Sequence, residues 1–245
     1  MIRRLIFNLE GGAENCVLPR NLAYLLYSAL CDKLPSELAD ILHAQKITPL
    51  SSYILRTENG PRWVVSGFGT LGYEVLKTLE VLPELQLTKL NSNMALKIAE
   101  EPVALCEADF TRRHLVENPP NREYVLNFIT PTSFKSDGEY IIMPSKNLII
   151  KSLIQKWDAF SEQFKLTDED AINGIIEHCR VTRYKLSSCS YPLKGVNIPA
   201  FSGELTLSVR GPEPLLRIVA LLMDFANYSG VGIKTTLGMG GVIAQ

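Results

Sequence analysis

The strongest constraint on the fold of this chain is a repeated order of strand-like and helix-like segments along its 245 residues. Strands show as alternating apolar and polar residues, and helices as apolar residues three and four positions apart. In the first half, the strands expected on this basis are 2–9, 50–56, 62–68, 95–100 and 103–110, and the helices are 19–34, 35–44 and 72–82. Turn residues at 58–61 join two of these strands into a hairpin. The first half therefore predicts the order β-α-β-β-α-β.

The same order recurs in the second half of the chain. The strands expected there are 124–130, 180–188, 203–211 and 241–245, and the helices are 147–164, 168–179 and 212–230. Two prolines in the polar segment 118–123 suit a linker between the halves. A β-α-β-β-α-β unit is the ferredoxin-like arrangement, and its repetition predicts two tandem copies. We therefore predict an α+β protein with ferredoxin-like domains at 1–119 and 123–245.

A C-terminal glycine-rich loop, SGVGIKTTLGMGG at 229–241, joins the last expected helix to the last expected strand. A P-loop needs a glycine directly before its lysine and a helix after it, whereas here Ile233 precedes Lys234. The G-x-G-x-x-G fingerprint needs a glycine where Thr235 or Ile243 stands, and a βαβ unit beyond it. The spacing therefore argues against both of these common phosphate-binding loops.

The charges point to a local basic surface on a chain that is nearly neutral overall. The formal net charge is −1, which counts against a protein coated in positive charge. From 178 to 203, however, no Asp or Glu occurs, and Tyr184 and Tyr191 lie in this stretch. Its cations are Arg180, Arg183, Lys185 and Lys194. Cations interleaved with aromatic rings suit single-stranded nucleic acid, because rings stack on bases and cations meet phosphates. Two solvated strands without acids are the alternative.

The sequence carries no clear signal for a membrane, for secretion or for a metal. No run of about 18 apolar residues occurs, so no transmembrane helix is expected. The segment 1–10 is interrupted by Asn8 and Glu10 and lacks a cleavage site, so we expect a strand and not a signal peptide. The five cysteines are scattered, without a C-x-x-C pair, which favours reduced thiols and argues against zinc. We expect a cytoplasmic protein without a bound metal.

Several segments together resemble the RAMP superfamily and, within it, the endoribonucleases that process CRISPR precursor RNA. GVGIKTTLGMGGV (230–242) follows an amphipathic helix and is typical of the superfamily. The histidine-bearing segment LHAQKITPLSSYIL (42–55) is more typical of the processing enzymes. Further support comes from FITPTSFKSDGEY (128–140) and NIPAFSGELTLSVRG (197–211). The resemblance extends over nearly the whole chain.

The resemblance implies a metal-independent cleavage of repeat RNA. In this family the ribose 2′-hydroxyl attacks the adjacent phosphate and leaves a 2′,3′-cyclic phosphate and a 5′-hydroxyl. His43 is the implied acid–base residue, since histidine exchanges protons near neutral pH. A tyrosine on the preceding helix, either Tyr27 or Tyr24 with Tyr27 preferred, and Lys46 complete the implied site. Lys46 lies closer to the histidine than in the family's usual pattern, so Arg20 is an alternative cation for the phosphate.

The glycine-rich loop is expected to contact the RNA backbone. A loop with few side chains lets phosphates reach peptide N–H groups, and its lysine adds positive charge. The expected RNA-binding residues of the loop are Gly230, Gly232, Lys234, Gly238 and Gly240, and those outside it are Arg20 and the four cations of 180–194. The alternative is structural, because glycines permit positive φ angles and close packing of chains.

The partner implied by the resemblance is CRISPR repeat RNA, bound without a cofactor or a membrane by a monomer or a homodimer. A first alternative is a non-catalytic RNA-binding RAMP subunit of a CRISPR effector complex, in which the same loop would hold guide RNA. A second alternative is a ferredoxin-like protein that binds a small nucleotide, and the spacing of the loop argues against it.

Overall fold

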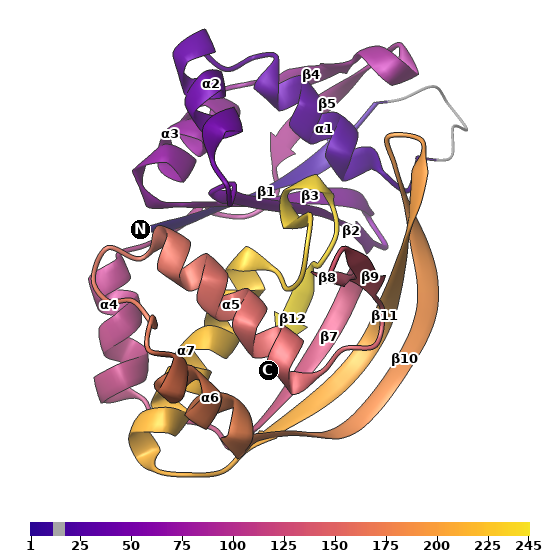
Figure 1. Ribbon diagram of the computed structural model, residues 1–245. Coiled ribbons are helices and arrows are strands. Elements are labelled where there is room, and N and C mark those ends of the chain that lie inside the picture. The colour runs from indigo at the N-terminus through magenta and orange to yellow at the C-terminus, as the bar shows by residue number, and fades with distance from the viewer. Residues whose placement is uncertain (12–17) are drawn as a thin grey trace.

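The computed structural model describes residues 1–11 and 18–245, and two antiparallel sheets form its framework (Figure 1). The first half of the chain builds a six-stranded sheet in the order β2-β3-β1-β5-β4, with β6 also paired to β1. Its strands are β1 (Ile2–Glu10), β2 (Leu50–Thr57), β3 (Gly60–Phe68), β4 (Glu84–Leu87), β5 (Ser92–Ile98) and β6 (Val103–Leu105). The short 3₁₀ helix η1 (Thr88–Leu90) connects β4 to β5.

Helices with apolar residues at helical spacing pack against one face of this sheet. They are α1 (Leu22–Cys31), α2 (Ser36–Ala44) and α3 (Gly69–Glu80). Leu26 and Leu30 of α1 and Leu76 of α3 are fully buried with Leu5 and Phe7 of β1. We call this group and the buried residues around it the first cluster. Burial of such side chains is the main stabilising contribution to a fold.

The second half builds a four-stranded sheet in the order β10-β11-β7-β12. Its strands are β7 (Glu123–Thr132), β10 (Cys179–Leu193), β11 (Val196–Val209) and β12 (Val242–Ala244). The helices packed on it are α5 (Lys146–Phe160), α6 (Glu169–His178) and α7 (Glu213–Ser229). A small separate hairpin pairs β8 (Phe134–Ser136) with β9 (Glu139–Ile141). The 3₁₀ helix η3 (Thr235–Leu237) lies between α7 and β12.

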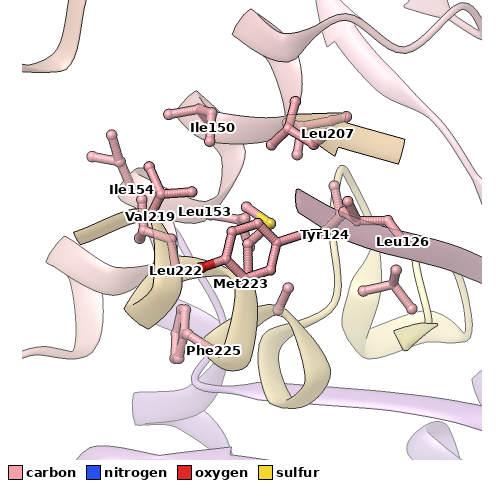
Figure 2. Packing of buried hydrophobic residues seen from close by; sticks show 14 of the residues in the cluster. Tyr124, Leu126, Ile150, Leu153, Ile154, Leu207, Val219, Leu222, Met223 and Phe225 are labelled. Carbon is pink, nitrogen blue, oxygen red and sulfur yellow. The ribbon is translucent and has the colours of Figure 1, made fainter. Parts of the chain in front are cut away.

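A second apolar cluster fills the space between this sheet and its helices, and Figure 2 shows part of it. Leu126 of β7 and Leu207 of β11 contribute from the sheet, and Leu153 of α5 with Leu222 and Phe225 of α7 contribute from the helices. All five side chains are buried. We call this group and the buried residues around it the second cluster.

The strand order identifies both sheets as ferredoxin-like. In each, the two strands after the first helical region form a hairpin on one side of the first strand, and the last strand pairs on its other side. This is the arrangement expected of a β-α-β-β-α-β unit. The prediction of an α+β protein with two tandem ferredoxin-like units is therefore confirmed.

Each apolar cluster includes residues from the other half of the chain. Tyr191, Leu193 and Ile198, at the tip of the β10–β11 hairpin, belong to the first cluster. Ile2 and Phe68 of the first sheet belong to the second cluster. Each half thus completes the apolar core of the other. The domain boundaries at 1–119 and 123–245 stay a prediction.

The segment 103–110 differs from the predicted strand. β6 ends at Leu105, and the chain continues as α4 (Glu107–Arg112) and a π-helical turn, η2 (Arg113–Glu117). Acids in the first turn of α4 and an arginine in its last turn suit a helix. Phe110 is buried in the second cluster, so contacts with the other half of the chain favour this conformation. The prediction of a strand through residue 110 is therefore wrong.

The structure also bears on the membrane and thiol predictions. Within residues 1–11 and 18–245, no helix is both long and apolar enough to cross a membrane. The cysteines recorded as free in that part of the chain are Cys31, Cys106, Cys179 and Cys189. Cys16, which was included in the prediction of reduced thiols, lies outside the described residues.

Candidate active site and RNA-binding surface

The candidate catalytic histidine, His43, lies in the last turn of α2 and is exposed to solvent. Leu42 beside it is buried in the first cluster and fixes the end of the helix. α2 ends at Ala44, and the backbone N–H of the next residue, Gln45, donates to the Leu42 carbonyl at 3.3 Å. Lys46 follows directly and is also exposed. The fold therefore presents His43 and Lys46 together at one helix end, open to a ligand from solvent.

Tyr27 lies on the neighbouring helix α1, where it is half-buried and packs against the first cluster. Burial raises the pKa of the Tyr27 phenol, and the Cys31 thiol one turn later adds to this effect. The phenol is therefore protonated at neutral pH, which suits a hydrogen-bond donor and not a base. The catalytic roles predicted for Tyr27, His43 and Lys46 stay predictions.

The glycine-rich segment 230–241 packs between the two halves of the molecule. Ser52 Oγ of β2 donates to the Thr236 carbonyl at 2.8 Å. Tyr191 Oη of β10 donates to the Leu237 carbonyl at 2.6 Å. The segment thus connects the edge of the first sheet to the hairpin of the second.

Four of its glycines, Gly230, Gly232, Gly238 and Gly240, are required by close packing. Gly230, Gly238 and Gly240 are buried and have φ angles of 63°, 100° and 70°. A Cβ on Gly230 would lie 2.7 Å from the Gly240 carbonyl oxygen. A Cβ on Gly238 would lie 2.8 Å from the Ala23 Cβ and closer still to the Tyr191 hydroxyl. Side chains rarely adopt such φ angles, and here they would also collide with neighbouring groups.

The glycine-rich segment reaches solvent at Lys234. Lys234 is exposed and has a φ angle of 54°, whereas Gly232 is half-buried. The Gly232 N–H donates to Ser152 Oγ at 2.8 Å, and the Ile233 N–H donates to the Ser133 carbonyl at 2.9 Å. These peptide N–H groups already have acceptors within the protein. The predicted contact with an RNA backbone is therefore best served by Lys234, and the role of the glycines in binding stays a prediction.

A β-bulge gathers the cations of β10 on one face of the second sheet. Arg180 pairs with Ser208 and Arg183 with Thr206, and the register shifts at Thr182 between them. Because paired residues of antiparallel strands point to the same face, the extra residue puts two arginines three positions apart on one side. The exposed cations on this side are Arg180, Arg183 and Lys185. The sequence predicted a basic strand but not this bulge.

Comparison with known proteins shows the family of the chain. Residues 126–242 match the family described as CRISPR-associated endoribonuclease Cas6. The chain is 34% identical over 227 residues to the Cas6 endoribonuclease of Streptococcus thermophilus, and the match covers 91% of both chains. The chain belongs to the Cas6 family. The predicted resemblance to CRISPR RNA-processing endoribonucleases of the RAMP superfamily is confirmed.

More distant Cas6 proteins also match most or all of this chain. A Cas6 endoribonuclease of Mycobacterium tuberculosis is 25% identical over 222 residues, which cover 90% of this chain and 70% of that protein. The Thermus thermophilus Cas6 in a solved product complex is 24% identical in sequence to this chain. The structural match covers 100% of both chains, with a TM-score of 0.78. The tandem arrangement of two ferredoxin-like units is thus the Cas6 fold.

In this Cas6 chain, cations from distant segments meet at Tyr24. Lys89 Nζ donates to the Tyr24 hydroxyl at 3.4 Å and lies 5.0 Å from the centre of its ring. Lys194, in the turn of the β10–β11 hairpin, lies 5.9 Å from the same ring. Arg20 is near enough to Cys189 to oppose the rise in pKa that burial gives this thiol. Figure 1 shows how the long β10–β11 hairpin reaches the start of α1.

Two predicted RNA-binding residues, Arg20 and Lys194, are thus brought to the same end of the molecule. The sequence did not predict Lys89 as a residue of this surface. Its proximity to Tyr24 arises from the position of η1 beside α1, which no local sequence pattern indicates. The two candidate tyrosines have different surroundings. The buried Tyr24 ring has Lys89 and Lys194 close to it, whereas the Tyr27 phenol lies beside the Cys31 thiol.

No group of three or more His, Cys, Asp and Glu side chains in residues 1–11 and 18–245 is arranged to hold a metal ion. Of the histidines, His114 pairs with Asp224 at 2.8 Å. His178 Nδ1 lies 2.7 Å from the Gly174 carbonyl oxygen. His43 is exposed and lies apart from both of these pairs.

Proposed function

We propose that the chain is an endoribonuclease that cuts CRISPR repeat RNA in precursor transcripts and releases mature guide RNA. The observation that carries this proposal is the match to the Streptococcus thermophilus Cas6 endoribonuclease over 91% of both chains. Solved Cas6 structures described as product and substrate-mimic complexes support RNA as the ligand. The exposure of His43 and Lys46 at the end of α2 supports a reaction site there.

We assign a metal-independent transesterification to this site. The ribose 2′-oxygen forms a bond to phosphorus while the bond from phosphorus to the 5′-oxygen breaks. The 2′-hydroxyl loses a proton, and the leaving 5′-oxygen gains one. His43 carries one of these protons, because a histidine exchanges protons near neutral pH. Lys46 balances the negative charge of the phosphate oxygens, and the protonated Tyr27 phenol donates a hydrogen bond.

The proposed partner is CRISPR repeat RNA, met in the cytoplasm without a cofactor. Delivery of the product to an effector complex is compatible with this role. The expected oligomeric state is either a monomer or a homodimer. Light scattering of the protein, with and without RNA, distinguishes these two states.

Cleavage of repeat RNA in EDTA tests the proposal. We expect wild type to cut the repeat once and to leave a 2′,3′-cyclic phosphate and a 5′-hydroxyl, both identifiable by mass spectrometry. A single 2′-deoxy substitution at the cut site should prevent the reaction, because it removes the attacking oxygen. Cleavage of the deoxy substrate, or a requirement for added metal, would contradict the mechanism.

The non-catalytic alternative has a distinct outcome. A RAMP subunit that only holds RNA would bind the repeat tightly and leave it intact in every buffer. The matched variants are His43→Ala and His178→Ala, since both histidines are exposed and lie near helix ends. Loss of cleavage with retained binding in the first variant alone supports the enzyme.

A further inference from the structure

A cavity of about 470 Å³ opens beside the free edge of β10, away from α2 and the glycine-rich segment. It lies between the start of α5, the segment that precedes α5, and the strand β10. Its volume is within the range of pockets that hold small organic ligands, roughly 300 to 1,000 Å³. The proposed cleavage reaction gives this cavity no role.

Exposed apolar side chains stand at its mouth. Tyr184 is 63% exposed and Met143 is 57% exposed, and both line the cavity. Tyr184 pairs with Leu205, so its ring lies on the same face of the sheet as the second cluster. Aromatic and thioether groups rarely stay this open on a face that otherwise forms a core.

Positive charge accompanies the apolar surface. Lys146 lines the same cavity, and none of its lining residues in the described chain is acidic. Among residues 1–11 and 18–245, Lys146 Nζ has one long hydrogen bond, 3.4 Å to the Glu177 carbonyl, which leaves its other N–H groups available to an acceptor from outside. Val181, Leu186 and Leu205 are the aliphatic lining. An aromatic ring, an apolar lining and a lysine together match a base with its phosphate.

We propose that this cavity binds an unpaired nucleotide of the RNA, with the base stacked on Tyr184 and the phosphate held by Lys146. The inference rests on the proposed function, since it takes RNA as the ligand. It adds to that function a site that holds single-stranded RNA away from the site of cleavage. The absence of acids from the cavity favours a nucleic acid over a second copy of this nearly neutral chain.

Binding of short unpaired RNA tests this site. Fluorescence anisotropy of fluorescein-labelled decamers of adenosine and of uridine is measured with full-length protein. Tyr184→Ala is expected to weaken binding by about five- to 150-fold, because loss of one stacking side chain costs about 1 to 3 kcal/mol. Tyr184→Trp keeps the aromatic face and should bind within about twofold of wild type. Tyr140→Ala is the matched control, because Tyr140 is exposed on the neighbouring β9 but does not line the cavity.

The salt dependence tests the phosphate contact separately. Lys146→Ala should lower the slope of log affinity against log salt concentration by about 0.7, because one fewer phosphate is neutralised on a single strand. Equal affinities of wild type and Tyr184→Ala would overturn the inference. So would a wild-type dimer, seen by light scattering, that Tyr184→Ala separates into monomers, because a second copy would then cover this face.

Cleavage of repeat RNA by wild type is measured in parallel, so that the two proposals fail separately. Cleavage together with decamer binding that ignores Tyr184 leaves the endoribonuclease standing and overturns the nucleotide site. Decamer binding that depends on Tyr184 without any cleavage supports the nucleotide site and overturns the endoribonuclease.

Discussion

At the residue scale, Lys156 is a buried lysine whose hydrogen-bond partners within the described residues are backbone carbonyls. Its Nζ donates to the carbonyls of Gly230 at 2.9 Å and Ser229 at 3.3 Å, where α7 ends and the glycine-rich segment begins. Burial lowers the pKa of Lys156 to about 7. The amine thus donates hydrogen bonds to carbonyls at the end of the helix, which have no N–H partner within it. Burial at this site disfavours the charged form of the amine.

This lowered pKa predicts a pH dependence of stability. Between about pH 7 and 10.5 the unfolded lysine binds a proton that the folded one does not, so the free energy of unfolding rises with pH. From pH 7 to pH 9 the gain is about 2 kcal/mol. Urea unfolding of wild type and Lys156→Met should show this gain only in wild type. Lys151→Met, on the exposed side of α5, should retain it, and a parallel pH profile in Lys156→Met would contradict the prediction.

Gly238 carries the clearest packing prediction. Gly238→Ala combines a φ angle of 100° with a clash against Ala23 and Tyr191, and should lower the free energy of unfolding by about 2 to 5 kcal/mol. Gly138→Ala is the matched control, since Gly138 has a φ angle of 85° but an added Cβ would meet no atom within 4 Å. It should cost only about 1 to 2 kcal/mol. Equal losses, measured by urea unfolding, would show that packing is not the cause.

At the scale of elements, the sequence predicts most strands and helices, and tertiary contacts explain the failure at 107–112. The helix at 107–112 was predicted as a strand, although Glu107 and Asp109 are the first-turn acids of a helix. Its conformation depends on partners far along the chain: the Glu107 carboxylate accepts hydrogen bonds from the Glu162 and Gln163 backbone N–H groups at 3.1 Å. No local pattern contains that information.

The β8–β9 hairpin is a different kind of failure, because its signal was present. Asp137 and Gly138 have φ angles of 50° and 85°, and they connect the two strands directly. Asp-Gly between strand-like residues is a strong indicator of a two-residue hairpin. The strands are only three residues long, so their alternation was too short to detect.

The contact of η2 with α7 provides a prediction at this scale. His114 of η2 pairs with Asp224 of α7 at 2.8 Å. Burial acts to raise the pKa of Asp224, but the hydrogen bond and charge of His114 outweigh it and the pKa is lowered. Removing either partner should lower the free energy of unfolding by about 1 to 3 kcal/mol. In a double-mutant cycle of His114→Ala and Asp224→Ala the losses should be clearly less than additive, whereas full additivity would contradict the coupling.

At the scale of the whole molecule, the exchange of core residues predicts that the two halves unfold together. Trp63 lies in the first cluster and Trp157 in the second, and they are the two tryptophans of the chain. Leu193 of the β10–β11 hairpin belongs to the first cluster, and Ile2 of β1 belongs to the second cluster. Separation of the halves would therefore expose apolar surface in both.

Single-tryptophan variants measure this directly. Trp63→Phe and Trp157→Phe each leave one fluorescent reporter, and both reporters should show the same transition in urea as circular dichroism does. Each substitution changes stability, so the reporter is compared with circular dichroism of the same variant. A tryptophan transition that departs from the circular dichroism transition would show that the halves unfold independently.

The candidate site depends on sequence and fold in different ways. His43 was found through resemblance, and the fold adds that it is exposed at a helix end beside Lys46. Lys89 was out of reach of the sequence, because it meets Tyr24 only after the first sheet has formed. The bulge at Thr182 was equally hidden, since it follows from strand pairing and not from residue type.

Single-turnover cleavage of repeat RNA in EDTA, with His43→Ala beside His178→Ala, tests the central claim most directly. We expect wild type and His178→Ala to cut at similar rates. His43→Ala should bind the RNA normally and cut it about 10² to 10⁴ times more slowly, the usual contribution of an acid–base group. Undiminished cleavage by His43→Ala, or no cleavage by wild type, would contradict the account.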